Sequence, residues 1–263
     1  MRVTLFMPCF NDVLFPGTGI STVRLLESMG HEVVFPGDQT CCGQIHFNTG
    51  YRTEATSLLG RFLDVFGGSE IVVAPSASCV AMVREQYPEL AALTNDADLE
   101  RTVGEVAGRT FELTEFLVHK MGVEDLGAHF PYRVAYHPTC HSVRSIDVGD
   151  APLRLLRAVR GLELRTLEGA EECCGFGGTF AVKNPHTSLA RMEDKIRDVA
   201  ESGAEVLTAV DNSCLLHLAG GMRRRGILAE GPANGSHRYR ENGGIRVMHL
   251  AEILAARKGG IQS

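Results

Sequence analysis

Eight cysteines are the residues of this sequence whose type and spacing can do chemistry. Each of two sets contains a single cysteine, an adjacent pair followed by glycine, and a final single cysteine. The two sets are Cys9, Cys41, Cys42 and Cys79, and Cys140, Cys173, Cys174 and Cys214. Four thiolates are the ligand number that iron–sulfur clusters and all-cysteine zinc sites use. We therefore expect one metal site in each half of the chain, with these eight cysteines as its ligands.

The adjacent pairs favour a multi-iron cluster over a disulfide. Neighbouring Cα atoms lie about 3.8 Å apart, whereas disulfides usually need at least about 4.4 Å, so a Cys41–Cys42 bridge would be strained. Two neighbouring thiolates also repel each other unless a cation neutralises them. A cluster meets this need because neighbouring sulfurs can bind different irons. Gly43 and Gly175 suit a backbone that must turn tightly beside a bulky ligand.

Zinc and simple burial are the competing interpretations of these cysteines. A lone free cysteine often acts as a small buried hydrophobe, but eight cysteines in duplicated register favour metal or redox chemistry. The usual zinc pattern has two close C-x2-C pairs, and neither half contains one. The second half does offer His137, His141 and His217 as nitrogen ligands, although packing or surface histidines are commoner.

The cysteine pattern belongs to a longer internal repeat. The matched segments are 2–9 with 133–140, 41–43 with 173–175, 71–79 with 206–214, and 113–121 with 249–257. Matching elements in the same order indicate a duplication. Glycine and proline residues between 122 and 131 mark the boundary, which predicts domains at residues 1–124 and 130–263.

Apolar periodicity predicts alternating strands and helices in both halves. The expected strands are 3–7, 31–35, 70–74, 133–136, 162–167 and 205–210, and the expected helices are 19–29, 51–66, 152–160 and 186–201. This alternation predicts an α/β fold of two tandem units, each a small parallel sheet flanked by helices. Every cysteine-bearing segment follows a strand. Ligands collect beyond the carboxyl ends of such strands, so each set of four should meet at one edge.

Charge and hydropathy narrow the class of protein. A net charge of −6 argues against a nucleic-acid or anionic-membrane partner. No apolar run approaches the roughly 20 residues of a membrane span, and the first residues do not form a signal peptide. We therefore expect a cytoplasmic protein, where spaced cysteines are metal ligands more often than disulfides. The polar segment 229–244 is expected to be a loop, and the basic run Met222–Arg225 a helix end.

Several motifs carry a resemblance to a known family over essentially the whole chain. They are PCFND at 8–12, QTCCGQ at 39–44, PSASC at 75–79, HPTCH at 137–141, CCGFGGTF at 173–180, DNSCLLH at 211–217 and HLAE at 249–252. The chain resembles the cysteine-rich CCG-domain family, which includes heterodisulfide reductase and anaerobic glycerol-3-phosphate dehydrogenase subunits. The similarity is greatest to the branch that serves bacterial L-lactate utilisation.

That resemblance implies one iron–sulfur cluster in each half, of the 4Fe–4S type, with zinc an alternative in one half. In the heterodisulfide reductase branch each repeat ends in C-x-x-C and supplies a fifth cysteine. Ser76 and Asp211 occupy the first position of that motif here. This departure counts against a five-cysteine cluster and against disulfide reduction, and leaves open a cluster in which Asp211 replaces the fifth cysteine.

The function implied by the resemblance is electron transfer within a cytoplasmic complex that oxidises L-lactate to pyruvate. The implied partners are a ferredoxin-like iron–sulfur protein and a third small subunit, so the chain would be a subunit rather than a self-sufficient enzyme. Two alternatives stay open: a subunit similar to a thiol–disulfide reductase, and a zinc–thiolate scaffold protein.

Overall fold

Two parallel sheets, one in each half, form the frame of the molecule. A computed structural model describes residues 1–229 and 244–258, and within these ranges the strands form two four-stranded parallel sheets. The strands of the first sheet are β1 (Arg2–Leu5), β2 (Glu32–Val34), β3 (Val72–Ala74) and β4 (Thr110–Glu112). Those of the second are β5 (Arg133–Tyr136), β6 (Glu163–Arg165), β7 (Val206–Ala209) and β8 (Arg246–His249).

The two sheets repeat each other in strand order and in register. Their orders are β2-β1-β3-β4 and β6-β5-β7-β8. Arg2 lies opposite Glu32 in the first sheet, just as Arg133 lies opposite Glu163 in the second. The predicted fold class, two tandem α/β units with parallel sheets, is confirmed.

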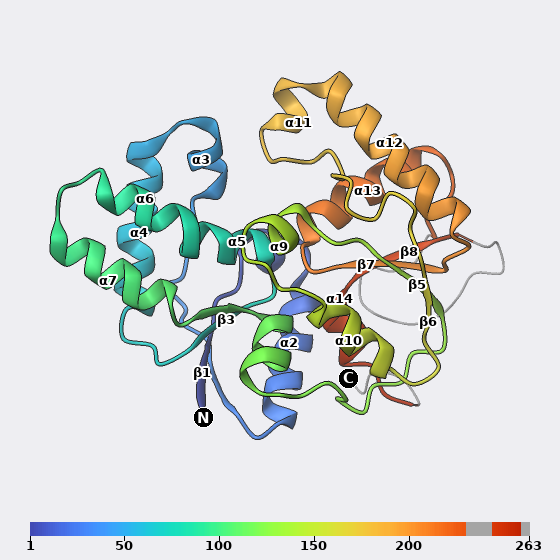
Figure 1. Cartoon of the computed structure of the whole chain (residues 1–263), viewed down its shortest axis with the longest axis horizontal. Coiled ribbons are helices and arrows are strands. Elements are labelled where there is room, and N and C mark those ends of the chain that lie inside the picture. Colours follow the sequence, from blue (N-terminus) through green and yellow to red (C-terminus); the bar gives the residue numbers. More distant parts are fainter. Residues whose placement is uncertain (230–243, 259–263) are drawn as a thin grey trace.

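Helices connect the strands and flank both sheets (Figure 1). In the first half they are α1 (Cys9–Leu14), α2 (Pro16–Ser28), α3 (Gln44–Thr49), α4 (Arg52–Phe66), α5 (Ala77–Ala81), η1 (Met82–Gln86), α6 (Tyr87–Ala92), α7 (Ala97–Ala107), α8 (Leu113–Glu115) and η2 (Phe116–Lys120). In the second half they are α9 (Cys140–Arg144), α10 (Ala151–Ala158), α11 (Phe180–Lys183), α12 (Pro185–Glu201), α13 (Asn212–Arg224) and α14 (Leu250–Leu254).

Strands β4 and β8 and helix α7 were not predicted from the sequence. Each of these two strands runs directly into a helix, and its last residue is also that helix's N-cap. Glu112 caps α8 and His249 caps α14, both through a capping box. The repeated segments 113–121 and 249–257 have the apolar pattern of helices and begin at or directly after these strands, so the helical pattern masked them.

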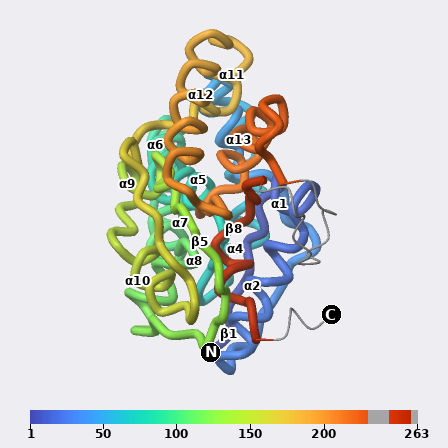
Figure 2. The backbone as a smooth tube through the Cα atoms, turned by 90° about the vertical axis from the view of Figure 1, so that its right-hand side faces the viewer, coloured from blue at the N-terminus to red at the C-terminus, as the bar shows by residue number. Residues whose placement is uncertain are grey.

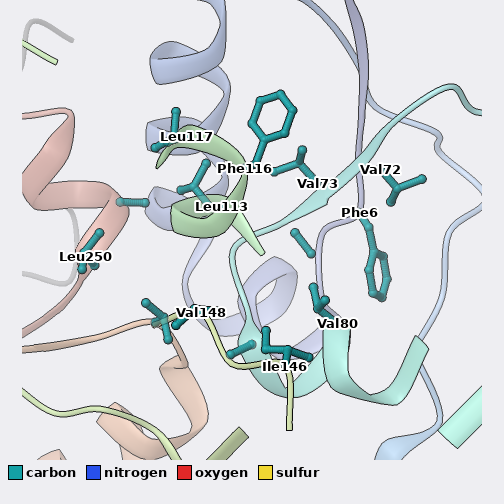
Figure 3. Packing of buried hydrophobic residues seen from close by; sticks show 14 of the residues in the cluster. Phe6, Val72, Val73, Val80, Leu113, Phe116, Leu117, Ile146, Val148 and Leu250 are labelled. Carbon is teal, nitrogen blue, oxygen red and sulfur yellow. The ribbon is translucent and has the colours of Figure 1, made fainter. Parts of the chain in front are cut away.

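One hydrophobic cluster joins the two halves. Figure 3 shows Phe116 and Leu117 of the first half in the same cluster as Val148 and Leu250 of the second. Helix α14 packs against α2, and α10 packs against α8, so each half contacts a helix of the other; Figure 2 shows α2 beside the red chain that follows β8. The division into domains 1–124 and 130–263 stays a prediction, but the shared core fixes the two sheet edges relative to each other.

Other expectations concern the ends of elements and the surface. The basic run Met222–Arg225 ends helix α13, as predicted. The polar segment expected at 229–244 lies almost entirely outside the described residues. Among the residues that are described, no helix has the length and apolar character that crossing a membrane requires.

Candidate metal centre

All eight cysteines line one pocket, whose volume is about 190 Å³. All are free thiols. The single cysteines lie in the first turns of helices: Cys9 and Cys140 begin α1 and α9, while Cys79 and Cys214 lie in α5 and α13. The adjacent pairs lie in the loops that follow β2 and β6. The sequence predicted a meeting point within each half, and the fold brings both sets to the same pocket.

Each adjacent pair is held by a glycine in the left-handed backbone region. Gly43 has φ of 85° and Gly175 has φ of 89°, which favour glycine. Their N–H groups donate to the first sulfur of each pair, at 3.4 Å to Cys41 Sγ and 3.3 Å to Cys173 Sγ. A Cβ atom at Gly175 would lie 2.4 Å from the carbonyl oxygen of Ser188, so close packing also excludes a side chain.

In the first set, hydrogen bonds favour the thiolate form of Cys41, the first cysteine of the adjacent pair. Hydrogen bonds from the Cys42 and Cys9 thiols and from the Gly43 N–H lower the pKa of Cys41 to about 2, although burial opposes this shift. The pKa of Cys42 is raised by its hydrogen bonds to Cys41 and Cys79 and by burial. The Sγ atoms of Cys42 and Cys79 lie 3.4 Å apart.

The second set repeats this arrangement. Hydrogen bonds from the Cys140 and Cys174 thiols lower the pKa of Cys173 to about 2, and the pKa values of the two donors are raised. A thiophilic cation would displace the protons that these donors hold, because metal ligands must be deprotonated. The donor sets therefore fit the thiolate ligation that iron–sulfur clusters and zinc require.

Asp211 connects the cysteine-bearing loops of the two halves. Its Oδ1 accepts hydrogen bonds from Ser76 Oγ at 2.8 Å, Ser78 Oγ at 2.8 Å and Ser78 N–H at 3.0 Å. Its Oδ2 accepts from Thr139 Oγ1 of the second half at 2.7 Å. These contacts lie where α5 and α9 meet, near the centre of the molecule (Figure 1). One buried carboxylate thus fixes the starts of helices that carry cysteines of both sets.

The structure accounts for the two departures from the family motif. Ser76 caps α5 by accepting from the N–H of Cys79 at 3.3 Å and donates to Asp211. Both carboxylate oxygens of Asp211 face protein donors. The positions that hold the fifth cysteine in the heterodisulfide reductase branch therefore carry hydrogen bonds between the halves.

A second polar network ties the same loops together. The Asn11 Nδ2 donates to the carbonyl of Pro75 at 3.0 Å. Asn212 Nδ2 donates to Asn11 Oδ1 at 3.0 Å and to Thr18 Oγ1 at 2.9 Å. Thr18 in turn donates to Glu252 of α14 at 3.1 Å. Asn11 and Asn212 each lie two residues from a cysteine, so this network positions Cys9 and Cys214 across the boundary between the halves.

Beneath the adjacent pairs the two halves differ. In the first half Phe6 follows β1 and packs edge-on against Phe62 of α4, with ring centroids 5.0 Å apart. The equivalent position after β5 holds His137, whose backbone N–H donates to the carbonyl of Thr208 as the backbone N–H of Phe6 donates to the carbonyl of Val73. We call the position that follows the central strand, together with the helix position packed against it, the floor of each site. In the first half both positions are aromatic, and in the second the first of them is an imidazole.

The helix position of the floor also changes, from an aromatic side chain in the first half to a cationic one in the second. The buried faces of α4 and α12 align with Ala55 matching Ser188 and Phe62 matching Lys195. Lys195 is 2% exposed, and its ammonium donates to the carbonyls of Gly169 and Ala170 in the loop before Cys173. Burial lowers the pKa of this lysine.

His137 is the histidine that lies among the cysteines of the second half. It is 0% exposed, and burial lowers its pKa to about 3, with the Lys195 ammonium acting in the same direction. Within the described part of the chain, neither ring nitrogen makes a hydrogen bond. The other two histidines have polar contacts: His141 Nε2 lies 3.2 Å from Gln44 Nε2, and His217 Nε2 lies 3.4 Å from Ser188 Oγ.

Sequence reasoning missed Lys195 and the two buried asparagines. A signal for Lys195 existed in the repeat, since aligning the two helices after the CCG motifs places a lysine opposite a core phenylalanine. A charged residue at a core position of a duplicated helix marks a change of environment. Asn11 and Asn212 stood inside the motifs, but nothing in their spacing showed that they contact each other.

Comparison with known proteins agrees with this geometry. The sequence model of the cysteine-rich domain family matches residues 3–84 and 134–219, once in each half. The chain belongs to the cysteine-rich domain family. Both family matches contain the cysteine positions described above, and they agree with the duplication seen in the two sheets.

Relatives within this family match over nearly their whole length. The chain is 42% identical over 262 residues to lactate utilization protein A of Oceanobacillus iheyensis, which covers 99% of this chain and 100% of that protein. It is 39% identical over 257 residues to lactate utilization protein A of Bacillus subtilis, covering 98% of this chain and 100% of the relative.

Among solved structures, the chain is similar to a hypothetical protein from Helicobacter pylori. The TM-score is 0.57 at 11% sequence identity, and the match covers 96% of this chain and 48% of that one. The chain therefore spans about half the length of that structure. This likeness shows a common fold.

Proposed function

We propose that the chain is an iron–sulfur electron-transfer component of a cytoplasmic complex that oxidises L-lactate to pyruvate. The observation that carries this proposal is the meeting of two complete four-cysteine sets in one pocket. The lactate role comes from the relatives named lactate utilization protein A, which match over nearly the whole chain.

In this proposal each half holds one cluster of the 4Fe–4S type, with zinc as the alternative in one half. Cys9, Cys41, Cys42 and Cys79 would hold the first, and Cys140, Cys173, Cys174 and Cys214 the second. An iron–sulfur cluster carries one electron at a time, so the two electrons released when a hydroxy acid is oxidised would pass through such a cluster in two transfers. The chain's own residues supply the thiolates, the N–H groups of Gly43 and Gly175, and a shared pocket that keeps both centres close.

The chain would work with other proteins in this role. A ferredoxin-like iron–sulfur protein and a third small subunit complete the system that we propose. The cysteine-lined pocket would supply the ligands of the clusters that exchange electrons with these partners. Turnover of lactate would then depend on mixing this chain with its partners.

Anaerobic purification followed by iron, acid-labile sulfide and zinc assays tests the metal part of the proposal. We expect a coloured protein that contains iron and sulfide, with visible absorption that bleaches on reduction. A colourless protein with stoichiometric zinc and no sulfide, even after reconstitution with iron and sulfide, would contradict it. That result would favour the zinc–thiolate scaffold instead.

Lactate-dependent reduction tests the substrate part. The visible absorption of the loaded chain is followed after addition of L-lactate together with the proposed partner proteins. Bleaching with L-lactate but not with D-lactate or in the absence of partners is expected. If a small disulfide reoxidised the isolated reduced chain catalytically while lactate had no effect with the partners present, a thiol–disulfide reductase would replace our proposal.

A further inference from the structure

His137 has no structural explanation as a core residue of the second half. Its side chain is 0% exposed, and among the described residues neither ring nitrogen has a hydrogen-bond partner. Buried polar groups are normally hydrogen-bonded, so an unpartnered imidazole needs a reason. The first half shows that the fold does not require one, because Phe6 fills the equivalent position and packs against Phe62.

The ring of His137 lies among the thiols. A ring nitrogen of His137 and the Sγ atoms of Cys174 and Cys214 all lie within 4.8 Å of one another. Zinc ligation with Zn–S bonds of about 2.3 Å and Zn–N bonds of about 2.0 Å places tetrahedral ligand atoms about 3.5 to 3.8 Å apart. A movement of about 1 Å would therefore bring these three atoms onto one metal ion.

The carbonyl of Ala170 is the one backbone group that raises the pKa of the His137 ring, and among the described residues no group forms a well-aligned hydrogen bond with either ring nitrogen. Lys195 lies on the same floor, but its ammonium donates to the carbonyls of Gly169 and Ala170. His141 and His217 contact Gln44 and Ser188. Of the three histidines near these cysteines, His137 is the one that combines complete burial with unpartnered nitrogens.

We propose that His137 is a nitrogen ligand of the metal centre in the second half. That centre is then a mixed imidazole–thiolate site, whereas the first-half centre is held by thiolates alone. The metal is a borderline or thiophilic transition metal that accepts both donors: either iron within a cluster or a zinc ion. This inference rests on the proposed metal binding and adds to it a ligand that distinguishes the two halves.

The test detects a metal–nitrogen bond in the second half alone. Full-length Cys42→Ser protein is expected to lose the metal of the first site, so the remaining metal signal comes from the second, and a metal content of half confirms this before the measurement. In this background, X-ray absorption at the edge of the metal found counts sulfur and nitrogen neighbours. If that metal is iron, pulsed electron paramagnetic resonance of the reduced protein with ¹⁵N-labelled histidine detects the coupled nitrogen.

Substitution of His137 should remove this nitrogen. The variant His137→Phe copies the residue of the first half and is expected to lose the nitrogen signal, with at least a tenfold weaker retention of second-site metal against a chelator. His137→Gln serves as a second variant should the phenylalanine disturb folding. His141→Gln and His217→Gln are the matched controls, and both should keep the nitrogen signal.

The outcomes separate this inference from the proposed function. A metal centre with sulfur neighbours alone in the Cys42→Ser protein, or a nitrogen signal that persists in both His137 variants, would overturn the role of His137. Such a result would leave the cysteine sites standing. Loss of the nitrogen signal in one of the control variants, but not in His137→Phe, would also overturn the role of His137 and would assign the ligand to the histidine replaced in that control.

Discussion

The two halves of this chain share a backbone frame but differ in what lies beneath their cysteines. Strand order, register, the glycine after each cysteine pair and the thiolate at the first cysteine of that pair are the same in both. The floor of the first half is aromatic, with Phe6 packed on Phe62, whereas the second has His137 and Lys195 at the same positions. A duplication can thus preserve the spacing of ligands while the surrounding side chains set different chemistry.

A second contrast lies where the halves meet. Glu112 and His249 end the equivalent strands β4 and β8, and both cap the helix that follows. One is an acid and the other a base, and both are almost completely buried. Burial therefore shifts the pKa values of these two groups in opposite directions, upward for Glu112 and downward for His249.

The largest expected effect is loss of one metal centre. Cys42→Ser and Cys174→Ser each remove a buried thiolate from one set, so the metal content after reconstitution should fall to about half. Iron, sulfide and zinc per chain provide the measurement, with Ser213→Ala as a control from the same pocket. If either substitution emptied both sites, the halves would not bind metal independently.

Removing the link between the halves should have the next largest effect. Asp211→Asn replaces an acceptor of four hydrogen bonds with an amide that cannot accept them all, so we expect the free energy of unfolding to fall by about 2 to 4 kcal/mol. Ser76→Ala removes one of these donors and should cost about 1 kcal/mol. Denaturant unfolding of the metal-free chain measures both. Equal losses would show that Asp211 is not the centre of the network.

Replacing the buried lysine should show how the floors of the two sites differ in their effect on stability and reduction. Lys195→Met leaves the carbonyls of Gly169 and Ala170 without their donor, and we expect a loss of about 1 to 3 kcal/mol in unfolding free energy. The loaded second centre should also become harder to reduce, because a nearby cation stabilises the more negative reduced state.

Phe62→Met is the matched substitution in the first half. It removes an aromatic contact without altering charge, so the reduction potential of the first centre should not move. A redox titration of both variants compares them. If Lys195→Met and Phe62→Met shifted the potentials alike, the cation would not distinguish the centres.

The smallest expected effect, taken per pH unit, is on the pH dependence of stability. Burial raises the pKa of Glu112 to about 8 from 4.5, so the unfolded chain loses this proton first and stability falls as pH rises through that interval. Burial lowers the pKa of His249 to about 4 from 6.5, so the unfolded chain gains this proton first and stability falls as pH drops through that interval. Each slope is on the order of 1 kcal/mol per pH unit.

Two variants test these opposite slopes. Glu112→Gln should flatten the alkaline side of the stability curve of the metal-free chain, and His249→Asn should flatten the acid side. Thermal unfolding across pH 4 to 9, roughly the span of both pKa values, provides the measurement. The contrast fails if one variant flattens both sides, because the two groups would then titrate as one unit.

Much of the frame was predictable because it is local. The strand at 133–136 coincides with β5, and helix 51–66 differs from α4 by one residue, since apolar periodicity marks such segments directly. The eight cysteines and their two sets followed from spacing alone. Strand β4 was missed because it runs without a break into a helix, and Glu112 at its end belongs equally to that helix.

The sequence by itself determined the duplication, the two cysteine sets and the parallel sheets, because each of these depends on residues close together or on repeated spacing. Tertiary structure alone decided that both sets share a pocket and that Asp211 binds Ser76, 135 positions away. It also decided which of three nearby histidines is buried among the thiols. The physical reason is that burial and long-range hydrogen bonds depend on how the two halves pack, and spacing along a chain carries no record of that packing.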